Sequence, residues 1–258
     1  MTNNAEPLEL DVTVRHGRMH CTLHGEGEPL VLLHGALGTG EAHFRGQIDE
    51  LARSYRLIVP DFLGYGRSGR RDYFDGAFHS RDAEDVVALV EQIGVSPVHL
   101  CGFSDGAIVA MVVATHYGEI LRSLTLIGGQ PVMDEKGMSM TRKWKPPENL
   151  ASGFRDALAR YHGDPYWSEM VTKYVDAFEG LYAAGGDPIG APLEGISCPT
   201  LIVHGVYDPW VDVSHAHDMH AAITGSRLEV LERAGHEVQR DRPEEFNRLL
   251  LDFLASVG

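Results

Sequence analysis

The chain has 258 residues, of which 43% are hydrophobic and 23% are charged. This length and composition suit a globular protein with a sizeable core, and they exclude a disordered or fibrous chain. The 22 basic and 37 acidic residues give a formal net charge of −15, which disfavours nucleic acid and anionic lipid as partners and favours cationic ligands.

Cysteine usage and the N-terminus indicate a cytoplasmic protein. The three cysteines, Cys21, Cys101 and Cys198, are widely spaced and form no CxxC pair. The first residues lack a basic start followed by an apolar run, and no stretch of about 18 apolar residues occurs anywhere. We therefore expect a reducing compartment, no export and no insertion into a membrane.

Short apolar runs alternate with helical patterns along most of the chain. Segments 11–15 and 19–24 alternate polar and apolar residues and predict an antiparallel hairpin. Nearly continuous apolar runs, typical of strands buried on both faces, follow at 29–35, 56–61, 97–102, 121–128 and 199–205. Helical patterns lie between them at roughly 41–53, 79–94 and 105–117. This alternation predicts an α/β fold with a mostly parallel, doubly wound sheet.

The strand rhythm stops between about 131 and 195, where prolines and aromatic residues lie among helical stretches. We interpret this interval as a helical cap inserted into a core domain formed by 1–130 and 196–258. A last helix is predicted to begin near Pro243. Five aromatic residues of the interval either line a pocket or pack within the cap: Trp144, Tyr161, Tyr166, Trp167 and Tyr174.

A nucleophile elbow is predicted at residues 102–106. Gly102-Phe103-Ser104-Asp105-Gly106 matches the pattern G-x-S-x-G, follows an apolar strand and opens a helical segment. The glycines let strand and helix approach closely, and the turn would project the Ser104 hydroxyl above the sheet. The alternative is a tight turn with an ordinary N-cap serine.

A serine nucleophile needs a base and a carboxylate that orients the base. On this kind of sheet the three residues follow in the order serine, acid, histidine. Asp208 follows an apolar strand in HGVYDPWV, and His236 lies in the loop ERAGHEVQ before the last helix. Asp212 is the competing acid, but Pro209 makes Asp208 the better residue for a turn.

Other histidines are expected to be structural. His99 and His204 lie within apolar strands, where core or sheet-edge positions are typical. His215, His217 and His220 form an H-x-H-x-x-H cluster, but on one helix its first two members do not share a face. We therefore expect no metal and no cofactor.

Acyl transfer also needs two backbone donors for the developing oxyanion. The residue after the nucleophile, Asp105, would supply one, and Ala36 in HGALG after the first buried strand would supply the other. His34 is expected to brace this loop. The second glycine-rich loop, 61–68, is expected to brace the site as well, because it lacks the GK[ST] ending of a phosphate loop.

The motifs HGALG, DFLGYGRS, GFSDGA, HGVYDPWV and AGHE, in this order, resemble the α/β-hydrolase superfamily. Within it the chain is similar to the valacyclovir hydrolase or biphenyl-hydrolase-like proteins in RDAEDVVALVEQIGVSPVHLCGFSDGAIVA and CPTLIVHGVYDP, with a divergent cap. The resemblance implies hydrolysis of α-amino-acid esters and binding of the substrate ammonium by Asp105. Alternatively, Asp105 merely favours the positive end of its helix.

The leading hypothesis is therefore a serine hydrolase that cleaves carboxylic esters through an acyl-enzyme. One alternative is a lactone or enol-lactone hydrolase or a C–C bond hydrolase with the same three residues. Another is a small-molecule receptor with slow turnover and a cap that acts as a lid. The expected partner is a small-molecule ester or lactone, and nothing in the sequence indicates a surface for a protein partner.

Overall fold

The computed structural model describes residues 7–71 and 74–257. Within these ranges eight strands form one sheet in the order β1-β2-β4-β3-β5-β6-β7-β8. The strands are β1 (Leu8–Thr13), β2 (Arg18–His24), β3 (Glu28–Leu33), β4 (Tyr55–Pro60), β5 (Val98–Phe103), β6 (Leu121–Ile127), β7 (Thr200–Gly205) and β8 (Arg227–Leu231). Pairing is antiparallel from β1 to β2 and from β2 to β4, and parallel in the rest of the sheet.

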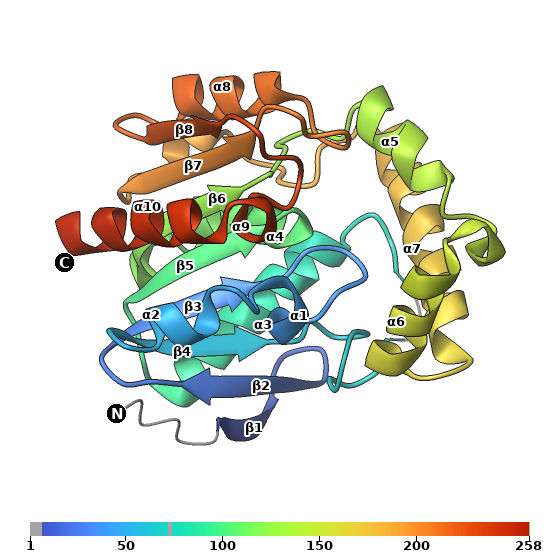
Figure 1. Cartoon of the computed structure of the whole chain (residues 1–258), viewed down its shortest axis with the longest axis horizontal. Helices are drawn as coiled ribbons and strands as arrows, with labels where there is room; N and C mark the ends of the chain where they lie inside the picture. The colour runs from blue at the N-terminus through green and yellow to red at the C-terminus, as the bar shows by residue number, and fades with distance from the viewer. Residues whose placement is uncertain (1–6, 72–73, 258) are drawn as a thin grey trace.

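Helices cover both faces of the sheet (Figure 1). One face carries α3 (Phe78–Ile93), α4 (Asp105–His116) and α8 (Val213–Ala222), with the 3-10 turns η1 (Gly118–Ile120) and η3 (Leu193–Gly195). The other carries α1 (Gly40–His43), α2 (Ile48–Leu51), α9 (Val238–Asp241) and α10 (Pro243–Ser256). Each face has its own apolar cluster, and the predicted doubly wound α/β sheet is confirmed.

The buried strands were predicted accurately because their apolar character is continuous. All six residues of β5 and of β7 are buried, as expected for strands covered by helices on both faces. Helix α4 is buried through its first ten residues, Asp105 to Ala114, since the sheet and α3 enclose it. The amphipathic helix α3 ends at Gly94, whose φ of 71° is the left-handed conformation that glycine adopts freely.

The helix predicted over 41–53 is wrong, because the segment forms two short helices, α1 and α2. The first begins after Thr39, whose side chain accepts a hydrogen bond from the Ala42 N–H. The chain then turns so that Phe44 is fully buried in the apolar cluster beneath α10. The Gln47 side chain is also buried and donates to the carbonyl of Gln239 and to Asn247 Oδ1. These contacts with the C-terminal part of the chain override the local helical pattern.

Three helices fall within the interval predicted as the cap: α5 (Glu135–Arg142), α6 (Ser152–His162) and α7 (Tyr166–Ala183), with the 3-10 turn η2 (Pro147–Asn149). They lie together beyond the carboxyl ends of the central strands (Figure 1). Helix α7 packs against both α5 and α6. The division at 131 and 195 stays a prediction. None of the helices formed by residues 7–71 and 74–257 is long and apolar enough to cross a membrane.

Candidate active site

Ser104 lies at a sharp turn between β5 and α4. Its φ of 54° and ψ of −118° are sterically unfavourable for a residue with a side chain. The glycines on either side have no room for a Cβ atom: one built on Gly102 would lie 2.1 Å from the Gly106 carbonyl oxygen, and one on Gly106 would lie 2.2 Å from that of Leu33. This crowding explains the glycine positions of the G-x-S-x-G pattern.

Three side chains form a continuous hydrogen-bonded chain. His236 Nε2 lies 2.9 Å from Ser104 Oγ, and His236 Nδ1 lies 2.7 Å from Asp208 Oδ2. The carboxylate therefore holds the proton on Nδ1 and leaves Nε2 free to accept the hydroxyl proton of Ser104. The structure thus brings the predicted nucleophile, base and acid together in the predicted order.

Asp208 is held as a carboxylate by its surroundings. Asp208 is only 6% exposed. Its Oδ1 accepts hydrogen bonds from the backbone N–H groups of Trp210 at 2.8 Å and Val211 at 2.9 Å. Burial acts to raise the pKa of Asp208, but the hydrogen bond from His236 and the two backbone donors together keep this pKa below its ordinary value.

Asp212, the competing acid, caps a helix and does not contact His236 in the described structure. It is the N-cap of α8, where its side chain accepts from the Ser214 N–H at 3.1 Å, and it pairs with Lys136 at 3.3 Å. The hydrogen bond to Ser214 lowers the pKa of Asp212 to about 2. These contacts occupy Asp212 at the start of a helix, while the contact with His236 is made by Asp208.

The two predicted oxyanion donors lie beside the nucleophile. Ala36 and Asp105 both line the cavity above Ser104. Within the described ranges neither backbone N–H donates to a protein acceptor, and Asp105, as the first residue of α4, has no partner inside its helix. Gly35 passes so close that a Cβ on it would lie 2.9 Å from Ser104 Cβ. Both amides are therefore available to a ligand at this point.

Hydrogen bonds from the second glycine-rich loop and from α6 brace the Ala36 loop. The fully buried His34 donates from Nδ1 to the Gly35 carbonyl at 2.7 Å and accepts the Phe62 N–H at Nε2 at 2.9 Å. His162 of α6 spans both loops, because its Nε2 donates to the Leu37 carbonyl and its Nδ1 accepts the Gly66 N–H, each at 2.9 Å. Burial lowers the pKa of His162 to about 4, so the ring is neutral and can make both bonds.

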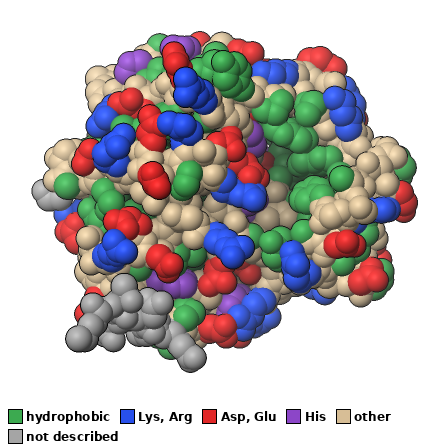
Figure 2. All heavy atoms as spheres, viewed as in Figure 1, with side chains coloured by type: hydrophobic (Ala, Val, Ile, Leu, Met, Phe, Trp, Pro, Cys, Tyr) green, Lys and Arg blue, Asp and Glu red, His purple; other side chains and the backbone are tan. Residues whose placement is uncertain are grey.

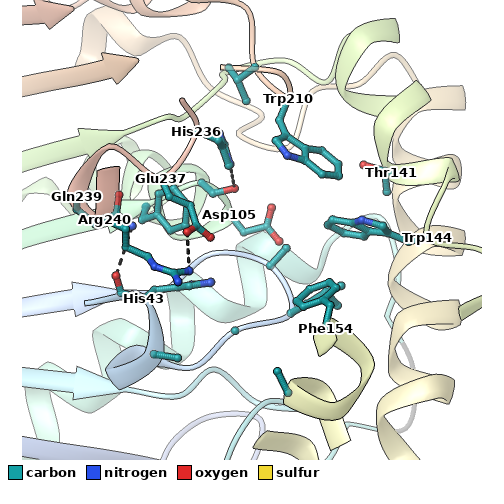
Figure 3. A pocket seen from close by; sticks show the side chains of 18 of the residues that line it. His43, Asp105, Thr141, Trp144, Phe154, Trp210, His236, Glu237, Gln239 and Arg240 are labelled. Atoms are coloured by element: carbon teal, nitrogen blue, oxygen red, sulfur yellow. Dashed lines mark hydrogen bonds and ion pairs between the residues drawn. The ribbon is translucent and has the colours of Figure 1, made fainter. Parts of the chain in front are cut away.

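A cavity of about 850 Å³ opens above Ser104 between the sheet and the helices α5, α6 and α7. Figure 2 shows hydrophobic side chains beside a hollow on this face of the molecule. Inside, Trp144, Phe154 and Trp210 form an aromatic wall, and the Trp144 and Trp210 rings lie 4.9 Å apart (Figure 3). The opposite side is polar and carries His43, Glu237, Gln239 and Arg240.

Asp105 presents a carboxylate to this cavity. The residue is 8% exposed, and its Oδ2 accepts a hydrogen bond from the Tyr174 hydroxyl at 2.9 Å. Burial raises the pKa of Tyr174 well above its ordinary value, so the phenol stays protonated and keeps donating. The other oxygen, Oδ1, lies 3.8 Å from Nε2 of the buried His79, which is too long for a hydrogen bond.

The sequence identified only part of the cavity wall. Of the five predicted aromatic residues, Trp144, Tyr161 and Tyr174 line the cavity. Tyr166 instead donates its hydroxyl to the Gly64 carbonyl at 3.0 Å. Sequence reasoning missed His43, Phe154 and Trp210. The signal for Trp210 was its place two residues after Asp208, whereas no motif marks the other two.

Four further histidines that were expected to be structural are either buried in the sheet or hydrogen-bonded to a side chain. His99 and His204 are fully buried in β5 and β7. His215 Nε2 lies 3.0 Å from Asp134 Oδ2, and His220 Nδ1 lies 2.9 Å from Ser226 Oγ. Within the part of the chain that the structure describes, no group of three or more His, Cys, Asp or Glu side chains is arranged to hold a metal ion.

The sheet order and the strained serine at the turn between β5 and α4 together define an α/β hydrolase. The chain belongs to the alpha/beta hydrolase family, whose pattern matches residues 30–249.

Comparison with characterised proteins places the chain near two kinds of hydrolase. It is 31% identical to the serine hydrolase BPHL of Homo sapiens over 247 residues, which covers 94% of this chain and 85% of that protein. It is 30% identical over 274 residues to a 2-hydroxy-6-oxononadienedioate/2-hydroxy-6-oxononatrienedioate hydrolase of Klebsiella pneumoniae, covering 96% of this chain and 94% of that one. The chain is thus a hydrolase by family.

Solved structures agree on the fold. A meta-cleavage product hydrolase from Pseudomonas fluorescens superposes with a TM-score of 0.83 at 21% identity, covering 96% of this chain and 98% of that one. An esterase from Exiguobacterium antarcticum superposes with a TM-score of 0.78 at 24% identity, covering 96% and 100%. At these identities the likeness concerns the fold alone.

Proposed function

We propose that the chain is a serine hydrolase that cleaves carboxylic esters through an acyl-enzyme. The observation that carries the proposal is the hydrogen-bonded chain from Ser104 through His236 to Asp208. Ser104 Oγ attacks the ester carbonyl while His236 Nε2 takes its proton, and the imidazolium then protonates the leaving alcohol. A water molecule, deprotonated by His236, attacks the acyl-enzyme and releases the acid.

Electrostatic stabilisation comes from the backbone. The N–H groups of Ala36 and Asp105 are assigned to the oxyanion of the tetrahedral intermediate. A single donor of this kind is worth about 3 kcal/mol of activation free energy. The hydrogen bonds of His34 and His162 fix the Ala36 loop before substrate arrives, so little reorganisation accompanies the reaction.

The preferred substrates carry an ammonium group next to the scissile carbonyl, as in α-amino-acid esters. A carboxylate next to a developing oxyanion is unfavourable unless a cation balances it. Asp105 is such a carboxylate, and its only strong hydrogen-bond donor in the described structure is the neutral Tyr174 hydroxyl. Its Oδ1 is therefore available to an ammonium group.

The decisive experiment compares kcat/KM for an aromatic amino-acid ester with that for its des-amino analogue. We expect a preference of about a hundredfold for the amine, consistent with a charge-assisted hydrogen bond in a desolvated site. In Asp105→Asn the amino-acid ester should lose about 2 to 3 kcal/mol in kcat/KM, while the neutral ester is unaffected. Equal losses on both esters would reduce Asp105 to a structural role.

A second candidate is hydrolysis of a C–C bond, because the Klebsiella pneumoniae relative is named for a dienedioate substrate. The same three residues would serve this reaction. Asp105 argues against it for this chain, since a buried carboxylate repels an anionic substrate. Turnover of such a dienedioate at a rate above that of the amino-acid ester would reverse the order of the two proposals.

A further inference from the structure

His43, the last residue of α1, lies in the polar side of the cavity and takes no part in the proposed proton transfers. Its Nδ1 accepts the Gly35 N–H at 3.0 Å, and its ring packs edge-on against Phe103 with centroids 5.1 Å apart. A Cβ atom on Gly38 would lie 2.4 Å from His43 Nε2, so only glycine leaves room for the ring. The imidazole is therefore held firmly in one orientation.

This geometry fixes the tautomer of His43. Since Nδ1 is an acceptor, the proton of the neutral ring is on Nε2. Burial, reinforced by the neighbouring His34 and Arg240, lowers the pKa of His43 well below its ordinary value, so the ring stays neutral at working pH. Within the described structure Nε2 has no hydrogen-bond partner, and the ring points into the cavity (Figure 3). His43 thus offers a free N–H donor that stays in one protonation state around neutral pH.

The position of His43 in the cavity indicates which part of the substrate its Nε2–H would contact. Asp105 points toward the aromatic wall, while His43 lies on the polar side of the cavity, near Arg240 (Figure 3). An ammonium group on Asp105 places the acyl part at the aromatic wall and directs the leaving alcohol toward His43. On that side a second cavity, of about 580 Å³, shares Ala42, Arg45 and Tyr161 with the first.

We propose that His43 is a specificity-determining residue that donates a hydrogen bond from Nε2 to an oxygen of the leaving alcohol. The preferred leaving groups are then alcohols with an ether, carbonyl or hydroxyl oxygen a few atoms from the scissile bond. This inference rests on the proposed function, because the ammonium contact decides which end of the cavity receives the alcohol. The polar second cavity gives such a group space to extend, with His20, Thr22 and His24 in its wall.

The test uses two esters of one amino acid, the 2-methoxyethyl and the n-butyl ester. Their alcohols differ only in that the first has an ether oxygen where the second has a methylene group. We expect kcat/KM to be about five- to tenfold higher for the methoxyethyl ester, the effect of one neutral hydrogen bond in a site that excludes water. His43→Phe should bring this ratio to about one, and His43→Gln, which keeps an N–H donor, should restore part of it. The ratio should stay constant between about pH 6 and 8, because His43 remains neutral there.

A matched control separates recognition from loop order. His162→Phe removes the two hydrogen bonds that brace the Ala36 loop while leaving the His43 ring untouched, so both rates should fall and the ratio should persist. Loss of the ratio in His162→Phe as well, or an unchanged ratio in His43→Phe, would overturn the role of His43. Amine preference without any preference for the methoxyethyl group would overturn this inference and leave the proposed function standing. Absence of the amine preference would instead overturn the ammonium contact at Asp105. It would also overturn the assignment of the acyl part to the aromatic wall and of the leaving alcohol to the side of His43.

Discussion

Asp208→Asn is expected to abolish nearly all activity while leaving the fold intact, because of how the side chain is anchored. Oδ1 of Asp208 accepts two backbone N–H groups, from Trp210 and Val211, so in the variant the amide oxygen must take this place. The amide nitrogen then faces His236 Nδ1, where Asp208 Oδ2 now lies at 2.7 Å. Since that nitrogen only donates, Nδ1 must become an acceptor and the ring proton moves to Nε2.

The His236 tautomer of this variant cannot accept the Ser104 proton. In serine proteases the same exchange lowers kcat by about 10⁴, and we expect a similar loss here, equivalent to about 5.5 kcal/mol of activation free energy. The assay is kcat on an aryl ester, with circular dichroism to verify folding. Asp212→Asn is the matched control, because asparagine is an equally good N-cap and should leave kcat within about twofold. Activity of Asp208→Asn within about tenfold of wild type would refute the proton-transfer scheme.

Three further results are expected. Ser104→Ala should lower the hydrolytic rate by about a thousandfold or more, and near-normal turnover would remove the mechanism. His79→Phe should raise the free energy of unfolding in urea by about 1 to 2 kcal/mol, because both His79 ring nitrogens are buried without a hydrogen bond in the described structure. The ring centroids of His79 and Phe78 lie 3.9 Å apart, so a phenyl ring would keep an aromatic neighbour. A loss of stability would contradict this. Burial, opposed by Arg71, raises the pKa of Asp82 to about 6, above the ordinary 3.8. As the pH falls from about 6 to 3.8, the folded state therefore binds a proton before the unfolded state does. The contribution of Asp82 to the free energy of unfolding should increase over this pH range. In urea titrations at several pH values, the free energy of unfolding of wild type minus that of Asp82→Asn should increase as the pH falls from about 6 toward 4.

The fold could be predicted from the sequence where one physical cause dominates. Strands β5 and β7 are covered on both faces, so their residues are uniformly apolar and their limits are visible within a residue or two. The turn at Ser104 was predictable because close packing admits only glycine at 102 and 106. The serine, aspartate and histidine chosen from their order along the chain also lie close together in the structure, where His236 contacts both Ser104 and Asp208 at hydrogen-bond distance.

Features that depend on distant contacts could not be predicted. The break between α1 and α2 follows from the hydrogen bonds of Gln47 with residues near the C-terminus, which no local pattern reveals. His43 is distinguished only by the Gly35 N–H that it accepts and by the cavity that it faces. Phe154 likewise reaches the aromatic wall only because α6 folds over the sheet. These residues differ from ordinary surface or core residues solely by their place in three dimensions.

The unfavourable backbone of Ser104 has a consequence for how this protein can evolve. A residue with a side chain at φ 54° and ψ −118° costs on the order of 1 to 3 kcal/mol, and a glycine would avoid much of that cost. The most stable residue at position 104 is thus expected to be one that cannot act as a nucleophile. Selection for thermal stability alone would remove the hydroxyl, so libraries screened only for heat resistance should drift toward folded, inactive chains at this position.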